Sequence, residues 1–160
     1  MNLEEFGDKM IYKDLPFLVA SNPYLAFIVL SAVLEFIARC RKTLKSIHDK
    51  NNTSGRYVDA IDNINALAPY RIYSRPRGKG HTNLLYTSLR CGLLHAGIPN
   101  SDIVLSSKKN DFSQNIIGCE SLYSDVKNAW EEIKSIPSVK YYLQNNKGVI
   151  IRNTNLNDTV

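Results

Sequence analysis

The hydrophobic positions along the chain predict helices separated by short polar turns. Apolar residues crowd every face from Asn22-Pro23 to about Ala38, and the pattern then becomes one-sided as far as Ile47. A proline near the start of such a stretch is typical of a helix N-terminus, so we expect one long helix here. Its first half would lie in the core, and its second half would emerge into solvent.

A second helix is predicted over residues 55–67. Tyr57, Ile61 and Ile64 recur there at helical intervals. Pro69 follows, and we expect it to close this helix.

A third helix is predicted to begin at Thr82, whose hydroxyl suits the N-cap position. It would run to about His95, bury its leucines on one side, and stop before Gly97 and Pro99. The glycines and the proline of residues 75–80, just ahead of it, predict a loop.

The last part of the chain combines short strand-like runs with a helix. Residues 102–107 and 115–119 are apolar runs around a polar turn, which predicts a small β-hairpin. Residues 120–135 form an amphipathic helix that Pro137 ends, and residues 148–152 are predicted as a terminal strand or a partner-dependent segment.

These elements predict an all-α fold: a four- to five-helix bundle with a small β-hairpin inserted before the last long helix. The 160 residues, 44% of them hydrophobic, fit a single domain over residues 1–160. The polar tail, residues 145–160, is expected to be flexible or dependent on a partner. The apolar stretch is shorter than the ~20 residues of a membrane span and contains Glu35, so we expect a core helix and no membrane.

The charge pattern adds a candidate contact for a polyanion. The formal net charge of +5 is modest, but one run carries several cations and no acid. The candidate RNA- or phosphate-binding residues in this run are Arg71, Arg75, Arg77, Lys79 and His81. Such a run either faces phosphates or is a solvated loop, and the sequence leaves both open.

The cysteines and the N-terminus predict a reduced, cytoplasmic protein. There are three cysteines without CxxC spacing, and the N-terminal residues carry no signal-peptide pattern. Cys91 and His95 have the spacing to share a metal ion, but no further cluster completes a site. We therefore expect no metal and no cofactor.

Arg90 and His95 are the candidate reactive pair, within Leu-Arg-Cys-Gly-Leu-Leu-His. A guanidinium in an apolar helix needs an acidic partner or an anionic ligand, and histidine exchanges protons near neutral pH. Together they suit cleavage of an RNA phosphodiester. The structural alternative, which the residues alone favour, pairs Arg90 with Glu35 or a C-terminal acid and lets His95 cap the helix end.

Helix geometry restricts the catalytic interpretation. Side chains five residues apart on an α-helix diverge by about 140°. Arg90 and His95 would therefore meet one ligand only if the helix ended or bent near Gly92, or if a two-fold dimer supplied half of the site.

The segment Arg90-Cys-Gly-Leu-Leu-His95 resembles the Arg–(four to six residues)–His signature of the HEPN superfamily. The apolar helix that carries Glu35 and the helix Ser121–Trp130 are similar to neighbouring helices of HEPN-like bacterial proteins. The resemblance spans roughly residues 16–136, which would be the HEPN-like core.

The resemblance implies a helical bundle that dimerises through the motif helices and acts as a metal-independent endoribonuclease in toxin or defence systems. Arg90 would hold the scissile phosphate, His95 would transfer a proton, and Glu35 would orient the arginine. The expected partners are a second copy, RNA, and an antitoxin or a nucleotidyltransferase. The apolar interval Gly-Leu-Leu keeps the alternative open, a non-catalytic HEPN-like module that binds RNA or a nucleotide or serves dimerisation.

Overall fold

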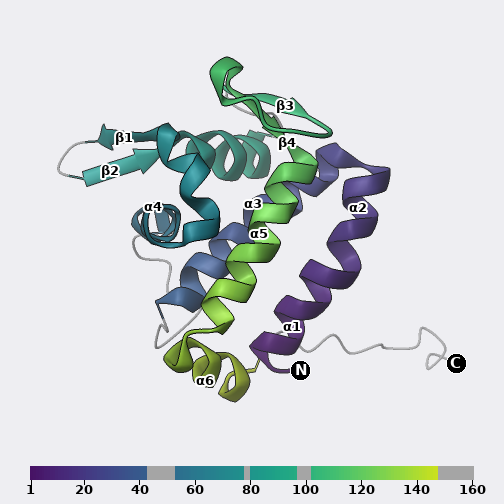
Figure 1. Ribbon diagram of the computed structural model, residues 1–160, viewed down its shortest axis with the longest axis vertical. Helices are drawn as coiled ribbons and strands as arrows, with labels where there is room; N and C mark the ends of the chain where they lie inside the picture. Colours follow the sequence, from purple (N-terminus) through teal and green to yellow (C-terminus); the bar gives the residue numbers. More distant parts are fainter. Residues whose placement is uncertain (43–52, 78–79, 97–101, 148–160) are drawn as a thin grey trace, which may run out of the picture.

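The structure is mostly helical, with two small sheets of two strands each (Figure 1). It is a computed structural model that describes residues 1–42, 53–77, 80–96 and 102–147. One hydrophobic cluster takes residues from each of these ranges, and Trp130 is the largest side chain fully buried in it. A mostly helical fold with a minor β component is therefore confirmed.

The central helix, α3 (Pro23–Arg41), begins where the sequence predicts. Asn22 caps it by accepting a hydrogen bond from the backbone N–H of Leu25 at 3.0 Å, and the proline occupies its first turn. The helix ends at Arg41, before the predicted end at Ile47. Residues 43–52 lie outside the described part of the chain.

α3 is the central helix of the molecule and packs against several other helices. It contacts α4 (Thr53–Asn63), α5 (Cys119–Lys134) and the π-helix η3 (Tyr86–Ala96). By length and composition alone α3 would suit a membrane span, but 56% of its most apolar window is buried inside the protein. More than half of this apolar window therefore packs against the rest of the protein, as in a core helix.

The first residues form helices that the sequence pattern does not predict. α1 (Leu3–Lys9), the π-helical turn η1 (Met10–Asp14) and α2 (Leu15–Ser21) follow one another along one side of the molecule (Figure 1). Their apolar residues are irregularly spaced, yet the buried ones join the core: Leu3, Ile11 and Leu15. The hydrophobic core therefore extends into this N-terminal segment.

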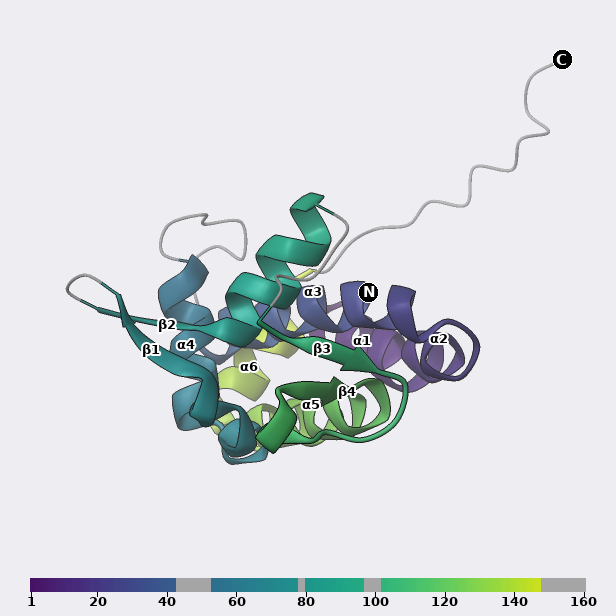
Figure 2. The same ribbon diagram turned by 90° about the horizontal axis from the view of Figure 1, so that it is seen from above.

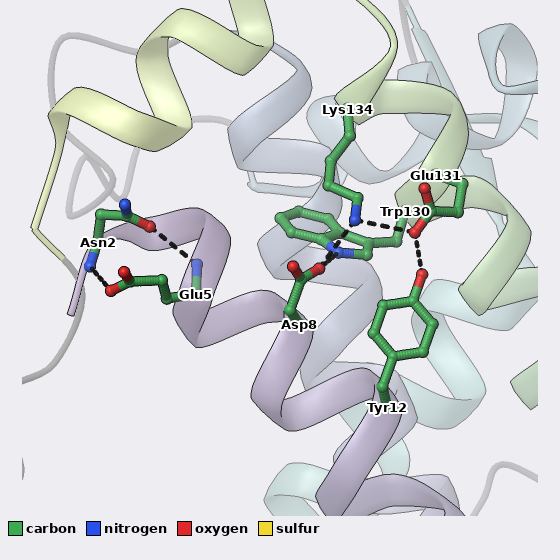
Figure 3. Close-up of polar contacts among 7 residues, drawn as sticks. All are labelled: Asn2, Glu5, Asp8, Tyr12, Trp130, Glu131 and Lys134. Atoms are coloured by element: carbon green, nitrogen blue, oxygen red, sulfur yellow. Dashed lines mark hydrogen bonds and ion pairs between the residues drawn. The ribbon is translucent and has the colours of Figure 1, made fainter.

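Polar side chains fasten this N-terminal segment to α5 (Figure 3). The Asp8 carboxylate accepts hydrogen bonds from the indole N–H of Trp130 at 2.7 Å and from Lys134 Nζ at 2.9 Å. Glu131 forms an ion pair with Lys134 at 2.8 Å and accepts a hydrogen bond from the Tyr12 hydroxyl. The polar atom of the fully buried Trp130 is thereby satisfied.

The two ends of the described fold meet. The backbone N–H of Leu3 donates to the carbonyl of Asn146 at 2.9 Å, and Asn2 forms an isolated antiparallel bridge with Lys147. Asn2 also forms a reciprocal capping box with Glu5 at the start of α1 (Figure 3).

The second predicted helix is divided in two. α4 ends at Asn63, and the 3₁₀-helix η2 (Asn65–Tyr73) follows after the extended residue Ile64. The carboxylate of Glu132, from α5, accepts hydrogen bonds from the first two backbone N–H groups of η2, at 2.9 and 3.1 Å. Pro69 lies inside η2, so the prediction that it closes the helix was wrong.

The expected loop before the motif helix is a β-hairpin. β1 (Ser74–Arg77) and β2 (Gly80–Asn83) pair antiparallel and project from the helical body in both views (Figures 1 and 2). Thr82 pairs with Arg75 in this ladder, so its prediction as a helix N-cap was wrong. The buried Asn83 side chain acts as the cap instead, because its Oδ1 accepts a hydrogen bond from the backbone N–H of Leu85 at 2.8 Å.

The two later strands lie where the sequence predicts them but pair differently. β3 (Val104–Ser106) and β4 (Ile116–Gly118) are parallel, so the predicted hairpin was wrong. Their connection contains the 3₁₀ turn η4 (Phe112–Gln114) and then Asn115 in the left-handed region, at φ 55°. Asp111 bridges back to the first residue of β4, so the chain reverses before it enters that strand.

The C-terminal part of the described chain is helical. α5 (Cys119–Lys134) confirms the amphipathic helix predicted over residues 120–135. Pro137 starts a further helix, α6 (Pro137–Asn145), whose Val139 and Leu143 are buried. The strand predicted over residues 148–152 lies outside the described residues.

The close packing of Gly7 on Trp130 predicts a destabilising substitution. A Cβ at Gly7 would lie 2.4 Å from Cζ2 of the buried indole, which has no room to move. Alanine improves helix propensity by about 1 kcal/mol, but overpacking costs ~1–3 kcal/mol. We expect Gly7→Ala to lower the free energy of unfolding by about 1 kcal/mol in urea denaturation. The exposed Lys9→Ala, on the same helix, should change it by less than about 0.5 kcal/mol, and a stabilised Gly7→Ala would contradict the packing argument.

Candidate functional site

The helix that carries the candidate pair is a π-helix rather than the predicted α-helix. In η3 (Tyr86–Ala96) the backbone pairing runs over five residues instead of four. Leu85, Leu89 and Leu93 are nevertheless buried on one side, as the sequence predicts. π-Helical segments are rare in proteins, and those that occur often lie at functional sites.

This register changes the relation between positions 90 and 95. Five residues make about one turn of a π-helix, so the two positions follow one another on the same side of η3. The divergence of about 140° that an α-helix would impose therefore does not apply. The His95 side chain lies outside the described part of the structure.

Arg90 is joined to Glu35 across the contact between η3 and α3. Arg90 Nε donates to Glu35 Oε2 at 2.9 Å, and the two side chains are 23% and 15% exposed. The structure thus brings two of the predicted site residues together. Both the catalytic interpretation and the structural alternative expect this pair.

Glu35 also binds Arg39, which the sequence analysis did not single out. Arg39 Nε and Nη2 donate to Glu35 Oε1 at 3.1 and 2.7 Å. The signal was present in the sequence, because Arg39 follows Glu35 by four residues on a predicted helix, a spacing that favours ion pairs.

Two tyrosines, Tyr86 and Tyr57, lie beside the pair of Arg90 and Glu35. The Arg90 guanidinium carbon lies 6.0 Å from the centre of the Tyr86 ring, within range of a cation–π contact. Tyr86 in turn meets Tyr57 edge to face, with the ring centres 5.1 Å apart. Tyr57 is 1% exposed, and its hydroxyl has no hydrogen-bond partner among the described residues.

The electrostatics of the cluster follow from burial and from the ion pairs. Burial raises the pKa of the Glu35 carboxyl, but hydrogen bonds from Arg90 and Arg39 outweigh it, so the pKa lies below its ordinary value of 4.5. The hydrogen bond to Glu35 raises the pKa of Arg90, although burial opposes this. Burial raises the pKa of Tyr57 further above neutrality, and the charge on Glu35 adds to that shift. At neutral pH the cluster therefore holds an ionised carboxylate, two guanidiniums and neutral tyrosines.

The basic run falls into parts with different roles. Arg71 donates from Nε to the carbonyl of Ile61 at 3.1 Å and from Nη2 to that of Ile64 at 3.4 Å, so it binds one carbonyl at the C-terminal end of α4 and one just beyond it. Arg75 is exposed on β1, where it also donates to two nearby carbonyls, and His81 is exposed on β2. Lys79 and the side chain of Arg77 lie outside the described part.

Metal ligands do not gather in the parts of the chain that the structure describes. Within those ranges no three His, Cys, Asp or Glu side chains are close enough to hold an ion. All three cysteines are free thiols, and Cys91 is half-buried beside Arg90 in the motif helix.

The lowered pKa of Glu35 predicts a pH-dependent contribution to stability. A carboxyl whose folded pKa is depressed stabilises the fold above its unfolded pKa, near 4.5, and this stabilisation is lost as pH falls through the folded pKa. We expect urea denaturation, repeated from pH 7 to pH 3, to give a higher free energy of unfolding for wild type than for Glu35→Gln. At neutral pH the difference between the two should be constant. The margin should narrow below about pH 4.5. The exposed Glu120→Gln is the control, and a margin independent of pH would refute the assignment.

Comparison with known proteins identifies no relative. No protein-family model, no curated protein and no solved structure matches this chain. The functional argument therefore rests on the chemistry of the cluster itself and on the resemblance of the Arg90–His95 segment to the HEPN signature.

Proposed function

We propose that the chain is a metal-independent endoribonuclease of the HEPN type, acting through Arg90 and His95. The observation that carries the proposal is the π-helical register of η3, which sets positions 90 and 95 about one turn apart on a helix whose arginine is anchored by Glu35. The fixed positive charge of Arg90 beside Glu35 also suits the binding of a phosphate.

In the proposed reaction the 2′-hydroxyl of a ribose attacks the adjacent phosphorus and the bond to the 5′-oxygen breaks. Arg90 neutralises charge on the phosphate as the transition state forms, and His95 moves a proton to or from the reacting oxygens. Glu35 holds Arg90 through Nε. The products are a 2′,3′-cyclic phosphate and a 5′-hydroxyl.

The proposal includes a two-fold homodimer with an HEPN-like bundle in each subunit. The motif helices of the two copies would line one cleft, as the resemblance implies. The basic run that contains Arg75, Arg77, Lys79 and His81 would guide the RNA backbone, with Arg75 and His81 exposed on the hairpin β1–β2, a contribution that does not depend on base sequence. We place the protein in the cytoplasm, in a toxin or defence system with an antitoxin or nucleotidyltransferase partner.

A second candidate function is a non-catalytic HEPN-like module that binds RNA or a nucleotide, or serves dimerisation. The ion pair between Arg90 and Glu35 favours it, because more than three quarters of the Arg90 side chain is buried against the fold. In that case Arg90 contributes to stability first and to ligand binding second.

The ribonuclease proposal predicts that purified protein cleaves RNA in the presence of EDTA and leaves 2′,3′-cyclic phosphate ends. Arg90→Ala and His95→Ala should each reduce the rate by at least ~100-fold, the scale on which acid–base and charge-stabilising groups act. The exposed Lys140→Ala is the control and should retain the wild-type rate. We would abandon the proposal if the wild type cleaved none of a varied set of RNAs.

The second candidate predicts strong coupling between Arg90 and Glu35 in stability. In a double-mutant cycle with Arg90→Met and Glu35→Gln, urea denaturation should give a coupling energy of about 1–3 kcal/mol. Oligonucleotide binding without cleavage would then accompany it. A coupling energy near zero would remove the structural role of the pair.

A further inference from the structure

The Glu35 carboxylate is held at both of its oxygens. Oε1 accepts hydrogen bonds from Arg39 Nε at 3.1 Å and Nη2 at 2.7 Å, and Oε2 accepts from Arg90 Nε at 2.9 Å. The two donors of Arg39 hold Oε1 in place, which restricts rotation of the carboxylate group. The position of Oε2, to which Arg90 binds, thus depends on Arg39.

Arg39 and Glu35 are both largely buried, which strengthens the hold of Arg39 on the Glu35 carboxylate. The side chains of Arg39 and Glu35 are each 15% exposed, so water competes weakly for the bonds that join them. Both residues lie on α3, one helical turn apart, and they form one rigid unit that meets η3 from the side. Arg90 comes from the other helix and meets this unit through its bond to Glu35.

Arg90 is restrained in two directions at this unit. Glu35 accepts a hydrogen bond from its Nε, and its guanidinium carbon lies over the Tyr86 ring, 6.0 Å from the ring centre. The charges of Glu35, Arg39 and Arg90 sum to +1, the sign that attracts a phosphodiester. An arginine restrained in this way keeps one orientation before the ligand arrives, which is how a fixed charge contributes most to catalysis.

We propose that Arg39 is a positioning residue of the site, which holds Glu35 so that Arg90 faces the scissile phosphate. Arg39 acts through Glu35. This inference rests on the proposed ribonuclease function and adds to it a residue outside the Arg90–His95 motif.

α3 supplies a matched control two residues further along. Arg41 and Lys42 pair with Asp59 of α4, at 3.0 Å for the lysine, and belong to a separate ion-pair cluster. Arg41→Met removes the same charge from the same helix as Arg39→Met. It leaves the pairs on Glu35 in place.

The first measurement does not depend on activity. Hydrogen exchange at the Nε–H of Arg90, followed by ¹⁵N NMR, reports the bond to Glu35. We expect Arg39→Met to accelerate this exchange about tenfold, the scale for loss of a charge-assisted hydrogen bond, and Arg41→Met to leave it unchanged. Arg39→Lys keeps the charge without the fork, so it should give an intermediate rate, and it replaces Arg39→Met if that variant does not fold.

The second measurement is the cleavage of RNA by the same variants. Arg39→Met should lower kcat about tenfold with little change in KM, since it disturbs the orientation of Arg90. If wild type cleaves no RNA, the ribonuclease function fails, and the exchange rates still decide whether Arg39 positions Arg90. Unchanged Arg90 exchange in Arg39→Met, or an equal fall in kcat for Arg41→Met, would overturn the inference.

Discussion

Glu35 is an ionised carboxylate on α3, the most apolar of the helices that the structure describes, with 15% of its side chain exposed. A charge in such a place is costly unless opposite charges and hydrogen bonds match it. Arg39 matches it from the same helix and Arg90 from η3. Because Arg90 has to reach α3 at this point, the register of η3 against α3 is set there, and the leucines of η3 are directed into the core. The candidate site and the packing of the central helices thus share one constraint.

The parts of the fold that sequence reasoning predicts well are those with a strong local signal. The start of α3 depends on Asn22 and Pro23, and α5 depends on one regular apolar stripe. The parts it missed are decided by residues far along the chain. Glu132 separates α4 from η2, Asp8 attaches the irregular N-terminal helices to Trp130, and Asn83 displaces Thr82 as the cap. None of these contacts leaves a periodic pattern.

The candidate site divides in the same way. Arg90 and Glu35 stand out in the sequence because a charge in an apolar helix demands a partner. Arg39 and Tyr86 lie within one turn of them, so spacing alone could have found both. Tyr57 belongs to another helix, and only the fold brings its ring to Tyr86. The π-helical register of η3 could not be predicted from the sequence, because buried leucines four residues apart fit an α-helix equally well.

The contact between Leu3 and Asn146 has a consequence for how the chain is made. During synthesis α1 is made well before α5 and α6, which bind it. The face of α1 around Gly7, which packs on Trp130 in the folded protein, stays uncovered until α5 has been made. Contacts between such distant residues form late and slow the folding of a domain. The native packing of α1 therefore forms only after α5 and α6 have been made, and until then the apolar face of α1 is open to other binding partners.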